Sequence, residues 1–338
     1  MQRNGHSDHD IRVGPRIRSM NLSIALCTYN GAVYLKEQLE SIAAQTRTPD
    51  ELVISDDQST DDTLRLIEEF AATAGFPVRL SVNESNLGTA KNFEKAISLC
   101  RGDVIVLSDQ DDVWHSDKLE SVERIFEAKP ELSLVFSNAE LVDETLRLYE
   151  ETLFDRLNFN GRKQRLVKSG RALDVQLREN LVLGATVAFR ANLKELVLPI
   201  SDAGPLIHDG WIVLLIASAG EIDFINRPLM KYRQHSAQQC GVGKTSTWRE
   251  ITTSSKIDRA CYVRQANQIN EAFARLAAYG LSQDKERLLR EKIVFLHKRA
   301  RLPVPKFQRW RSVGKEVVNR RYQRFSKGWV SVAKDLLA

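Results

Sequence analysis

The sequence predicts an α/β protein built on a mostly parallel, doubly wound central sheet. Between residues 22 and 107, four short apolar segments alternate with segments in which apolar residues recur at helical spacing. Such alternation is typical of parallel sheets whose strands are connected by helices. Polar clusters follow three of the apolar segments, at residues 28–30, 55–57 and 108–112. Because ligands bind beyond the carboxyl ends of parallel strands, the sequence also predicts a ligand site at these clusters.

Local patterns predict each element of this alternation. Strands are expected over the four apolar segments: 22–27, 52–54, 78–82 and 104–107. Helices are expected over the segments between them: 35–42, 59–70 and 90–99. Ser59 is placed to start the second helix, which would put Asp61 and Asp62 in a first turn where the helix dipole favours negative charge.

Beyond Pro130 the pattern becomes mixed. Further strands are expected at 132–136, 183–189 and 222–225, and a helix at 209–219. From Trp248 onward we expect helices that are interrupted near Pro303 and Pro305, because proline breaks a helix interior. The chain is therefore divided into three parts: a polar N-terminal segment (1–20), an α/β domain (21–240) and a basic helical C-terminal region (241–338).

The composition indicates a globular protein from a reducing compartment. Hydrophobic residues make up 43% and charged residues 28% of the 338 residues, which is ordinary for a soluble fold. Four widely separated cysteines form no CxxC pair, so neither a zinc site nor a disulfide framework is indicated. Residues 1–20 lack the apolar core of a signal peptide, and no run of about 18 apolar residues occurs. We therefore expect a cytoplasmic protein that would meet a membrane only at its inner face.

Positive charge is concentrated at the C-terminal end. The formal net charge is +5, yet residues 301–338 contain ten Lys and Arg residues and only two acidic residues. That segment therefore carries +8 and residues 1–300 carry −3. Trp310, Phe325 and Trp329 interleave with the basic residues, as in helices that lie on an anionic membrane surface. The alternative is a solvated helical cap that packs on the α/β domain.

Asp109 and Asp111 follow the fourth strand directly. Two carboxylates on one turn suit a divalent cation such as Mg²⁺ or Mn²⁺, which uses one or two carboxylates and completes its shell with substrate phosphates. Such a cation would neutralise a leaving diphosphate. The alternative is that these residues make only the hydrogen bonds of a turn.

Other polar residues are expected beside this segment. Asp56 and Asp57 end the second strand and could accept hydrogen bonds from a base or a ribose, or could simply shape the turn into the next helix. Thr28 and Asn30 offer hydroxyl and amide groups after the first strand. Lys91 could meet a phosphate or a base carbonyl, although an isolated lysine more often faces solvent.

Two further segments contain residues suited to catalysis and metal binding. Asp209 stands at the start of an apolar helical segment and could act as a general base towards an acceptor hydroxyl. Trp211 could stack on a sugar, or the two residues could be a capping Asp and a core Trp. His235 could be a neutral imidazole ligand of the cation, or an ordinary loop histidine.

Taken in order, these segments resemble a known family. The motifs are SIALCTYNG at 23–31, SDDQSTDDT at 55–63, NLG at 86–88, KNF at 91–93, LSDQDDVW at 107–114, GAT at 184–186, HDGW at 208–211 and YRQH at 232–235. Together they resemble the family 2 glycosyltransferases over about residues 21–240. The resemblance implies a GT-A fold, in which a Rossmann-like nucleotide-binding half joins an acceptor-binding half. It also implies direct displacement with inversion at the anomeric carbon.

The resemblance implies roles for the positions that match these motifs. Asp209 would be the catalytic base that takes the acceptor hydroxyl proton. A divalent metal would be held by Asp109, Asp111 and His235. The nucleotide-diphosphate sugar would be bound by Thr28, Tyr29, Asn30, Asp56, Asp57, Asn86, Gly88, Lys91, Ser108, Asp109 and Gln110. The acceptor would be met by Trp114, Gly184, Ala185, Thr186, His208 and Trp211.

The particular motif versions look most like a bacterial rhamnosyltransferase-like subgroup. Members of that subgroup build O-antigens and other surface polysaccharides, often from dTDP-rhamnose. We therefore expect a dTDP- or UDP-linked donor and a glycan or lipid-linked acceptor, and no nucleic-acid partner. Gly210 departs from related sequences, which often have an aromatic residue there, and this leaves the acceptor open.

Three other interpretations compete with sugar transfer. A nucleotidyltransferase could use two metals at the same carboxylates, but the turn after the first strand lacks a Gly-rich phosphate loop. A non-catalytic protein could bind nucleic acid or another polyanion through the basic tail, which would leave the ordered carboxylates unexplained. A degenerate transferase could bind a nucleotide sugar without turnover, although intact Asp111 and Asp209 argue against it.

Overall fold

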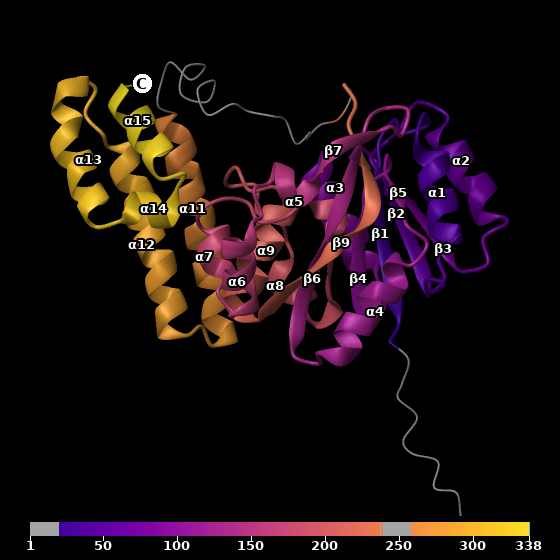
Figure 1. The fold of residues 1–338 in the computed structure, drawn as a ribbon. Helices are drawn as coiled ribbons and strands as arrows, with labels where there is room; N and C mark the ends of the chain where they lie inside the picture. Colours follow the sequence, from indigo (N-terminus) through magenta and orange to yellow (C-terminus); the bar gives the residue numbers. More distant parts are fainter. Residues whose placement is uncertain (1–19, 237, 239–257, 338) are drawn as a thin grey trace, which may run out of the picture.

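The computed structural model describes residues 20–236, 238 and 258–337 (Figure 1). The N-terminal segment expected over residues 1–20 lies outside the described residues except for Met20, and so does the expected start of the C-terminal helices at Trp248. The described chain folds into an α/β domain with a bundle of helices attached at one end. The predicted fold class, with a helical C-terminal extension, is confirmed.

A nine-stranded sheet forms the centre of the described chain, in the order β3-β2-β1-β4-β8-β6-β9-β5 with β7 beside β6. Its strands are β1 (Leu22–Thr28), β2 (Glu51–Asp56), β3 (Val78–Val82), β4 (Val104–Ser108), β5 (Val113–Trp114), β6 (Leu132–Val142), β7 (Leu148–Thr152), β8 (Val187–Arg190) and β9 (Glu221–Arg233). The first four strands are parallel, and so are β6 and β9. The remaining pairs are antiparallel. The doubly wound part therefore covers the first third of the chain, and a mixed sheet follows it.

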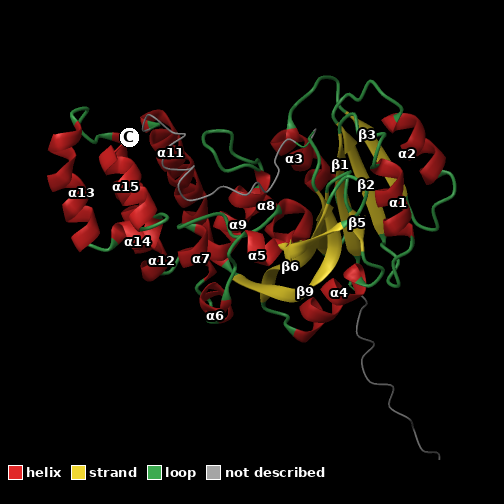
Figure 2. Cartoon of the chain, turned by 45° about the horizontal axis from the view of Figure 1, so that its top comes forward, coloured by secondary structure: helices red, strands yellow, loops and turns green. Residues whose placement is uncertain are grey.

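Helices cover both faces of this sheet (Figures 1 and 2). Those of the α/β domain are α1 (Leu35–Ala43), α2 (Thr63–Ala71), α3 (Thr89–Leu99), α4 (Lys118–Ala128), α5 (Leu153–Arg156), α6 (Gly161–Lys168), α7 (Ala172–Gln176), α8 (Lys194–Val197) and α9 (His208–Ala219). Those of the C-terminal bundle are α11 (Arg259–Leu276), α12 (Gln283–Ala300), α13 (Arg309–Val318), α14 (Arg321–Phe325) and α15 (Trp329–Leu337).

The alternation of side chains along the central strands produces two hydrophobic cores. Successive residues of a strand point to opposite faces, so Ile24 and Ala25 of β1 join different cores. Ile24 packs in the core that includes Leu39 of α1 and Leu119 of α4. Ala25 packs in the core that includes Phe93 of α3 and continues into α9. Burial on both faces explains why the central strands are apolar throughout.

Four expected elements differ markedly in their limits. Helix α2 begins at Thr63 and not after Ser59, because the backbone N–H of Ser59 donates to Asp56 and keeps residues 58–62 in a turn. The strand expected at 183–189 begins only at Val187, because residues 184–186 form a 3₁₀ turn in which Thr186 donates to the carbonyl of Leu183. Strands β6 and β9 extend well past their expected ends, because they pair with one another along most of their length.

The C-terminal bundle packs on the α/β domain through α11. Gln268 donates to the carbonyls of Ser201 and Leu206, which lie just before α9. Farther out, Asp335 of α15 accepts hydrogen bonds from Arg299 and Tyr322 within the bundle. None of the helices that the structure describes is long and apolar enough to cross a bilayer.

Candidate functional site

The carboxyl ends of β1, β2 and β4 meet at one edge of the sheet. Thr28 of β1 lies opposite Asp56 of β2, and Leu26 of β1 lies opposite Ser108 of β4. The three polar clusters predicted from the sequence are therefore neighbours. We call this edge, together with the loop at residues 86–88, the donor side.

Most polar groups of the donor side are already hydrogen-bonded within the protein. The buried carboxylate of Asp56 accepts from the hydroxyls of Thr28 and Ser59, at 2.7 and 2.6 Å. The buried carboxylate of Asp57 accepts from the backbone N–H groups of Leu87 and Gly88, at 2.7 and 2.8 Å. Asp56 and Asp57 therefore shape the turns at this edge through hydrogen bonds within the protein.

The loop at 86–88 depends on this carboxylate and on one glycine. Gly88 has φ +80°, a left-handed conformation that suits glycine, and it immediately precedes α3. The amide of Asn86 reaches the backbone carbonyl of Asp57 at 3.4 Å. Lys91, in the first turn of α3, donates to Glu94 and to the carbonyl of Ile200, both at 2.9 Å. Its ammonium therefore has one of three hydrogens left for a ligand.

The turn after β1 is tied to the acidic segment through Gln110. Its side-chain amide accepts from the backbone N–H of Tyr29 at 2.8 Å and donates to the Tyr29 carbonyl at 3.1 Å. The backbone N–H of Asn30 donates to Ser59, and its side-chain oxygen accepts from the N–H of Thr60. These contacts join the ends of three strands into one rigid edge.

The carboxylates of the acidic segment are buried and lie close to other negative charges. Burial raises the pKa of Asp109 to about 7, and the negative charges of Asp111 and Asp209 add to this effect. Burial also raises the pKa of Asp112, whose Oδ2 has no partner among the described residues. The buried ammonium of Lys118 opposes both shifts. Asp111 and Asp209 therefore both lie within electrostatic range of Asp109.

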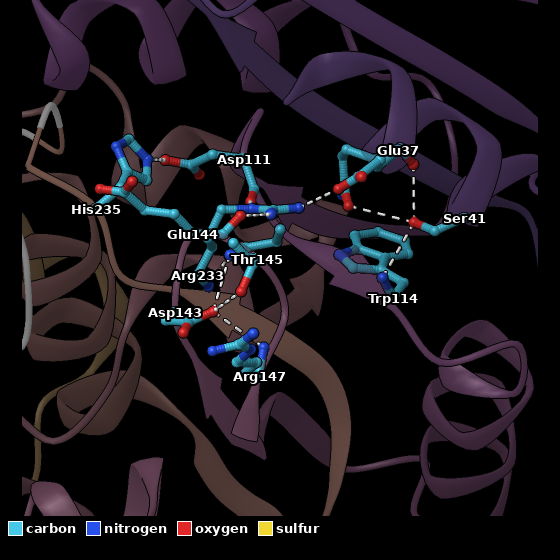
Figure 3. Close-up of polar contacts among 12 residues, drawn as sticks. Glu37, Ser41, Asp111, Trp114, Asp143, Glu144, Thr145, Arg147, Arg233 and His235 are labelled. Atoms are coloured by element: carbon cyan, nitrogen blue, oxygen red, sulfur yellow. Dashed lines mark hydrogen bonds and ion pairs between the residues drawn. The ribbon is translucent and has the colours of Figure 1, made fainter. Parts of the chain in front are cut away.

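Asp111 is paired with His235. The Oδ2 of Asp111 lies 2.8 Å from the Nε2 of His235, and both side chains are largely buried (Figure 3). The sequence predicted that these residues, 124 positions apart, would share a site. The ring of Tyr34 packs against the His235 ring, with centroids 4.7 Å apart.

Arg233 fixes the backbone around this pair. Its Nε donates to the Asp111 carbonyl at 2.9 Å, and one terminal nitrogen donates to the Glu144 carbonyl at 2.8 Å. The other terminal nitrogen pairs with Glu37 of α1, as Figure 3 shows, and the guanidinium stacks over the Tyr34 ring. One buried side chain thus holds α1, the acidic segment, the β6–β7 turn and the end of β9.

The side chains that could bind a metal fit a site in which the substrate supplies several ligands better than a site made of protein ligands alone. Among the described residues, no three His, Cys, Asp or Glu side chains come together to hold a metal ion. The Asp111–His235 pair nevertheless offers one carboxylate oxygen and one imidazole nitrogen, and the buried Nδ1 of His235 has no protein partner in the described chain. A Mg²⁺ or Mn²⁺ ion that takes most of its ligands from substrate phosphates needs no more than this. The pair therefore fits such an ion, with Asp109 beside it.

The start of α9 and the 184–186 turn contain the residues that the resemblance assigns to catalysis and to the acceptor, and we call them the acceptor side. Asp209 is in the first turn of α9, where the helix dipole favours a carboxylate, and its Oδ2 lies 3.4 Å from the amide of Asn180. His208 stacks on Phe93 with centroids 4.0 Å apart. Neither ring nitrogen of His208 has a partner in the described chain, and burial lowers its pKa.

Gly184 makes this packing possible. A Cβ on Gly184 would lie 2.5 Å from the Nε2 of His208, so any larger residue would displace the imidazole. Gly210 is less confined, because a Cβ there would meet the Leu206 side chain at 3.1 Å. Leu206 therefore fills space into which an aromatic residue at position 210 would extend, which gives a packing reason for the departure noted in the sequence.

Two of the residues expected to contact an acceptor lie in the core. Trp211 is fully buried, its indole N–H donates to the Val197 carbonyl at 2.9 Å, and Arg275 covers its ring. The expectation that it stacks on a sugar is therefore wrong. Trp114 is also buried and offers no surface to an acceptor. The Nζ of Lys118 lies over its ring, 3.9 Å from the ring centroid.

The other residues expected to contact an acceptor lie in or beside the 184–186 turn and expose little surface. Ala185 and Thr186 are buried, and the carbonyl of Ala185 accepts from Lys118 at 2.8 Å. Lys118 thereby connects this turn to the acidic segment on the donor side. Ser108 is buried as well, and its hydroxyl lies 2.7 Å from the amide of Gln38.

Four residues of the site escaped prediction from the sequence: Lys118, Arg233, Asn180 and Glu37. Arg233 could have been found, since it stands inside the YRQH motif beside His235. Lys118, Asn180 and Glu37 stand in segments with no motif, and a single lysine, asparagine or glutamate carries no local signal of burial or of a distant partner. Their roles arise from contacts with Ala185, Asp209 and Arg233.

Comparison with known proteins gives this geometry a family. The model for glycosyl transferase family 2 matches residues 23–177. The dTDP-rhamnosyl transferase RfbG of Shigella flexneri is 30% identical over 229 residues, which cover 64% of this chain and 73% of that protein. The chain belongs to glycosyl transferase family 2.

Two other relatives are less identical to this chain. An uncharacterized glycosyltransferase of a Nostoc species is 26% identical over 274 residues, which cover 80% of each chain. An uncharacterized protein of Mycobacterium tuberculosis is 28% identical over 217 residues, and the matched part spans 59% of its length and 64% of this chain.

Solved structures confirm the GT-A fold of this family member. Staphylococcus aureus TarS, crystallised with UDP-GlcNAc, superposes with a TM-score of 0.58 at 15% identity, over 94% of this chain and 88% of that one. A mannosyltransferase of Pyrobaculum calidifontis, in complex with GDP-Man and Mn²⁺, superposes with a TM-score of 0.51 at 18% identity, over 95% and 86% of the two chains. At these identities the likeness concerns the fold.

Proposed function

We propose that this protein is an inverting glycosyltransferase that moves a sugar from a nucleoside diphosphate to a hydroxyl of a glycan or lipid-linked acceptor. The observation that carries the proposal is the placement of Asp209. Its carboxylate lies in the electrostatic neighbourhood of Asp109, whereas the Asp111–His235 pair and the nucleotide-binding turns belong to the sheet edge. A base close to the site of the departing diphosphate is what direct displacement requires.

In the reaction that we propose, the oxygen of the acceptor hydroxyl attacks the anomeric carbon while the Asp209 carboxylate accepts the proton of that hydroxyl. The bond from that carbon to the diphosphate oxygen breaks on the opposite face, so the configuration inverts and the diphosphate departs with the bonding electrons. Asn180 orients the carboxylate, and Arg233 holds the backbone of Asp111 beneath the diphosphate. When bound, a divalent ion at Asp111, His235 and Asp109 would neutralise the charge of the leaving diphosphate.

We further propose rhamnose as the first sugar to test, from dTDP-rhamnose, for synthesis of a bacterial surface polysaccharide such as an O-antigen at the cytoplasmic face of the membrane. The support is the 30% identity to a protein named dTDP-rhamnosyl transferase. An abequosyltransferase of Salmonella typhimurium, 32% identical over 117 residues, points to the same kind of product. UDP-linked sugars are the second group to test, since TarS was crystallised with UDP-GlcNAc.

A donor panel tests the proposal. Unfolding temperatures are measured with dTDP-rhamnose, UDP-GlcNAc and GDP-mannose, each with and without Mn²⁺. We expect dTDP-rhamnose with Mn²⁺ to give the largest rise, because a ligand at 100 times its Kd stabilises by about 2.7 kcal/mol. Asp111→Asn should lose the Mn²⁺-dependent part of that rise, whereas Asp62→Asn, an exposed acid of the same type, should keep it.

Two results would count against the proposal. If no nucleotide sugar raises the unfolding temperature while a nucleoside triphosphate does, the nucleotidyltransferase alternative gains. If dTDP-rhamnose binds but no acceptor releases dTDP from it, the protein is a binding protein of the transferase fold.

A further inference from the structure

Helix α13 has an unusual outer face. Its inner side is formed by Arg309, Val313 and Glu316, which are buried at helical spacing against the bundle. Its outer side carries Trp310 and Val318, which are 66% and 82% exposed. The outer positions of a bundle helix are normally polar, so an exposed tryptophan and an exposed valine there indicate a surface that binds another molecule.

The segment before α13 continues this apolar surface. Phe307, one turn ahead of Trp310, is 76% exposed. Lys306 donates to the carbonyl of Leu337 at 2.5 Å, which places the exposed end of α15 beside the same turn. Figures 1 and 2 both show α13 at the end of the molecule opposite α2, so no described part of the α/β domain covers it.

The charged residues on the outer side of α13 are all basic. Arg311 and Lys315 lie four residues apart, are exposed, and have no hydrogen-bond or ion-pair partner among the described residues. The helix contains a single acid, Glu316, which is buried and pairs with Lys298 and Arg321. An ordinary solvated helix would mix both signs of charge on its outer side.

We propose that this surface, made of Phe307, Trp310, Arg311, Lys315 and Val318 and called the docking face below, binds an anionic lipid bilayer. Tryptophan and phenylalanine insert at the level of lipid headgroups, and neighbouring basic residues are attracted to anionic lipid. The inference goes beyond the transfer reaction and does not depend on it.

A bilayer fits this face better than other partners. Pairing of two copies through the same face would bring Arg311 and Lys315 towards their equivalents, with no acid on either side to offset the repulsion. A nucleic acid would pair with the two cations but would leave Phe307 and Val318 in water. An anionic bilayer, with an apolar phase beneath a negatively charged surface, satisfies both kinds of residue.

Flotation of the full chain with lipid vesicles tests the proposal. The vesicles contain phosphatidylcholine, alone or with about one-third phosphatidylglycerol. We expect binding to the anionic vesicles and about tenfold weaker binding to the neutral ones, since each basic residue near the surface contributes several-fold. Phe307→Ser with Trp310→Ser should weaken binding at least tenfold, and so should Arg311→Glu with Lys315→Glu.

The matched control is Tyr279→Ser with Val294→Ser, an exposed aromatic and an exposed aliphatic residue elsewhere in the same bundle. The control should float like the unmodified chain, and both docking-face variants should keep the nucleotide-induced rise in unfolding temperature. Equal flotation of the unmodified chain and the Phe307→Ser/Trp310→Ser variant overturns the proposal. So does a change from dimer to monomer in that variant by light scattering, or docking-face-dependent binding to RNA in place of vesicles. The nucleotide-binding readout fails only if the proposed function is wrong, so the two failures can be told apart.

Discussion

The donor side and the acceptor side of the candidate site differ in how their polar groups are satisfied. On the donor side, the Asp57 carboxylate accepts two backbone hydrogen bonds, and all three nitrogens of the Arg233 guanidinium have an acceptor. Only the Oδ2 of Asp112 and the Nδ1 of His235, among the buried polar atoms of this side described above, lack a partner in the described chain. On the acceptor side, both nitrogens of His208 lack a partner in the described chain. Asp209 accepts from the neighbouring backbone N–H of Gly210 and, at 3.4 Å, from the amide of Asn180.

This difference agrees with the two roles that we propose, nucleotide binding on the donor side and catalysis on the acceptor side. The donor side is held largely by internal hydrogen bonds, so the turns at which we propose nucleotide binding have their shape without a ligand. The acceptor side keeps unused hydrogen-bonding capacity at a buried imidazole and at the proposed base, which is costly for stability and useful for chemistry. Substitutions should therefore act mainly on stability and nucleotide binding on one side, and mainly on turnover on the other.

Replacing Arg233 should have the largest effect on stability. Arg233→Lys keeps the charge but cannot reach three separate acceptors, so we expect the free energy of unfolding to fall by about 3 kcal/mol. Mn²⁺-dependent binding of the nucleotide sugar should weaken as well, because the backbone of Asp111 is released. Arg227→Lys, in the same strand and in an exposed pair with Asp117, should cost less than about 1 kcal/mol. Chemical denaturation measures both, and equal losses would show that Arg233 has no special role.

Replacing Asp57 should have a smaller effect of the same kind. Asp57→Asn places an amide where the N–H groups of Leu87 and Gly88 now find a carboxylate, so at least one donor loses its acceptor. We expect a loss of about 2 kcal/mol in the free energy of unfolding and weaker nucleotide binding. Calorimetric titration with dTDP measures the second quantity, and unchanged affinity would mean that the 86–88 loop does not contact the nucleotide.

Replacing His208 should show the opposite behaviour. His208→Phe keeps the stack on Phe93 and removes two buried nitrogens without partners, so the free energy of unfolding should change by less than about 1 kcal/mol. Transfer should nevertheless fall, with kcat more affected than donor binding. A stability loss as large as that of Arg233→Lys would contradict the division between the two sides.

The same variant gives a pH test. Burial lowers the pKa of His208 in the folded state, so the unfolded chain binds a proton that the folded chain does not as the pH falls below about 6.5. The His208 contribution to stability is therefore present above pH 6.5 and is lost towards lower pH. The stability of His208→Phe relative to the unmodified chain should rise between about pH 7.5 and pH 5. A constant difference would mean that folding does not shift the pKa of His208.

The sequence alone predicted the central elements well because their signals are local. The strands ending at Thr28, Asp56 and Ser108 each combine a short apolar run with a turn cluster, and the parallel arrangement then brings the clusters together. The order of the later strands could not be predicted in this way. Strand β9 pairs with β6, about 90 residues earlier, through backbone contacts that leave no local mark.

The errors in the site have a geometric cause. Asp209 and Trp211 are two positions apart, which on a helix turns them about 200° from one another. The helix that carries both residues is almost entirely buried, and Trp211 points away from Asp209 into the core. Phe325 shows the same limit in the C-terminal region: it is buried in the bundle, whereas Trp310 and Trp329 are exposed. An aromatic residue beside basic residues does not by itself say which way it points.

The most direct test of this account is to compare transfer and donor binding in Asp209→Asn. With dTDP-rhamnose or whichever sugar nucleotide binds in the donor panel, we expect kcat to fall by about 10²- to 10⁴-fold while the nucleotide-induced rise in unfolding temperature is unchanged. Asp202→Asn, an exposed acid seven positions earlier, should retain full activity. Full transfer activity in Asp209→Asn, or loss of nucleotide binding together with activity, would contradict the assignment of chemistry to the acceptor side.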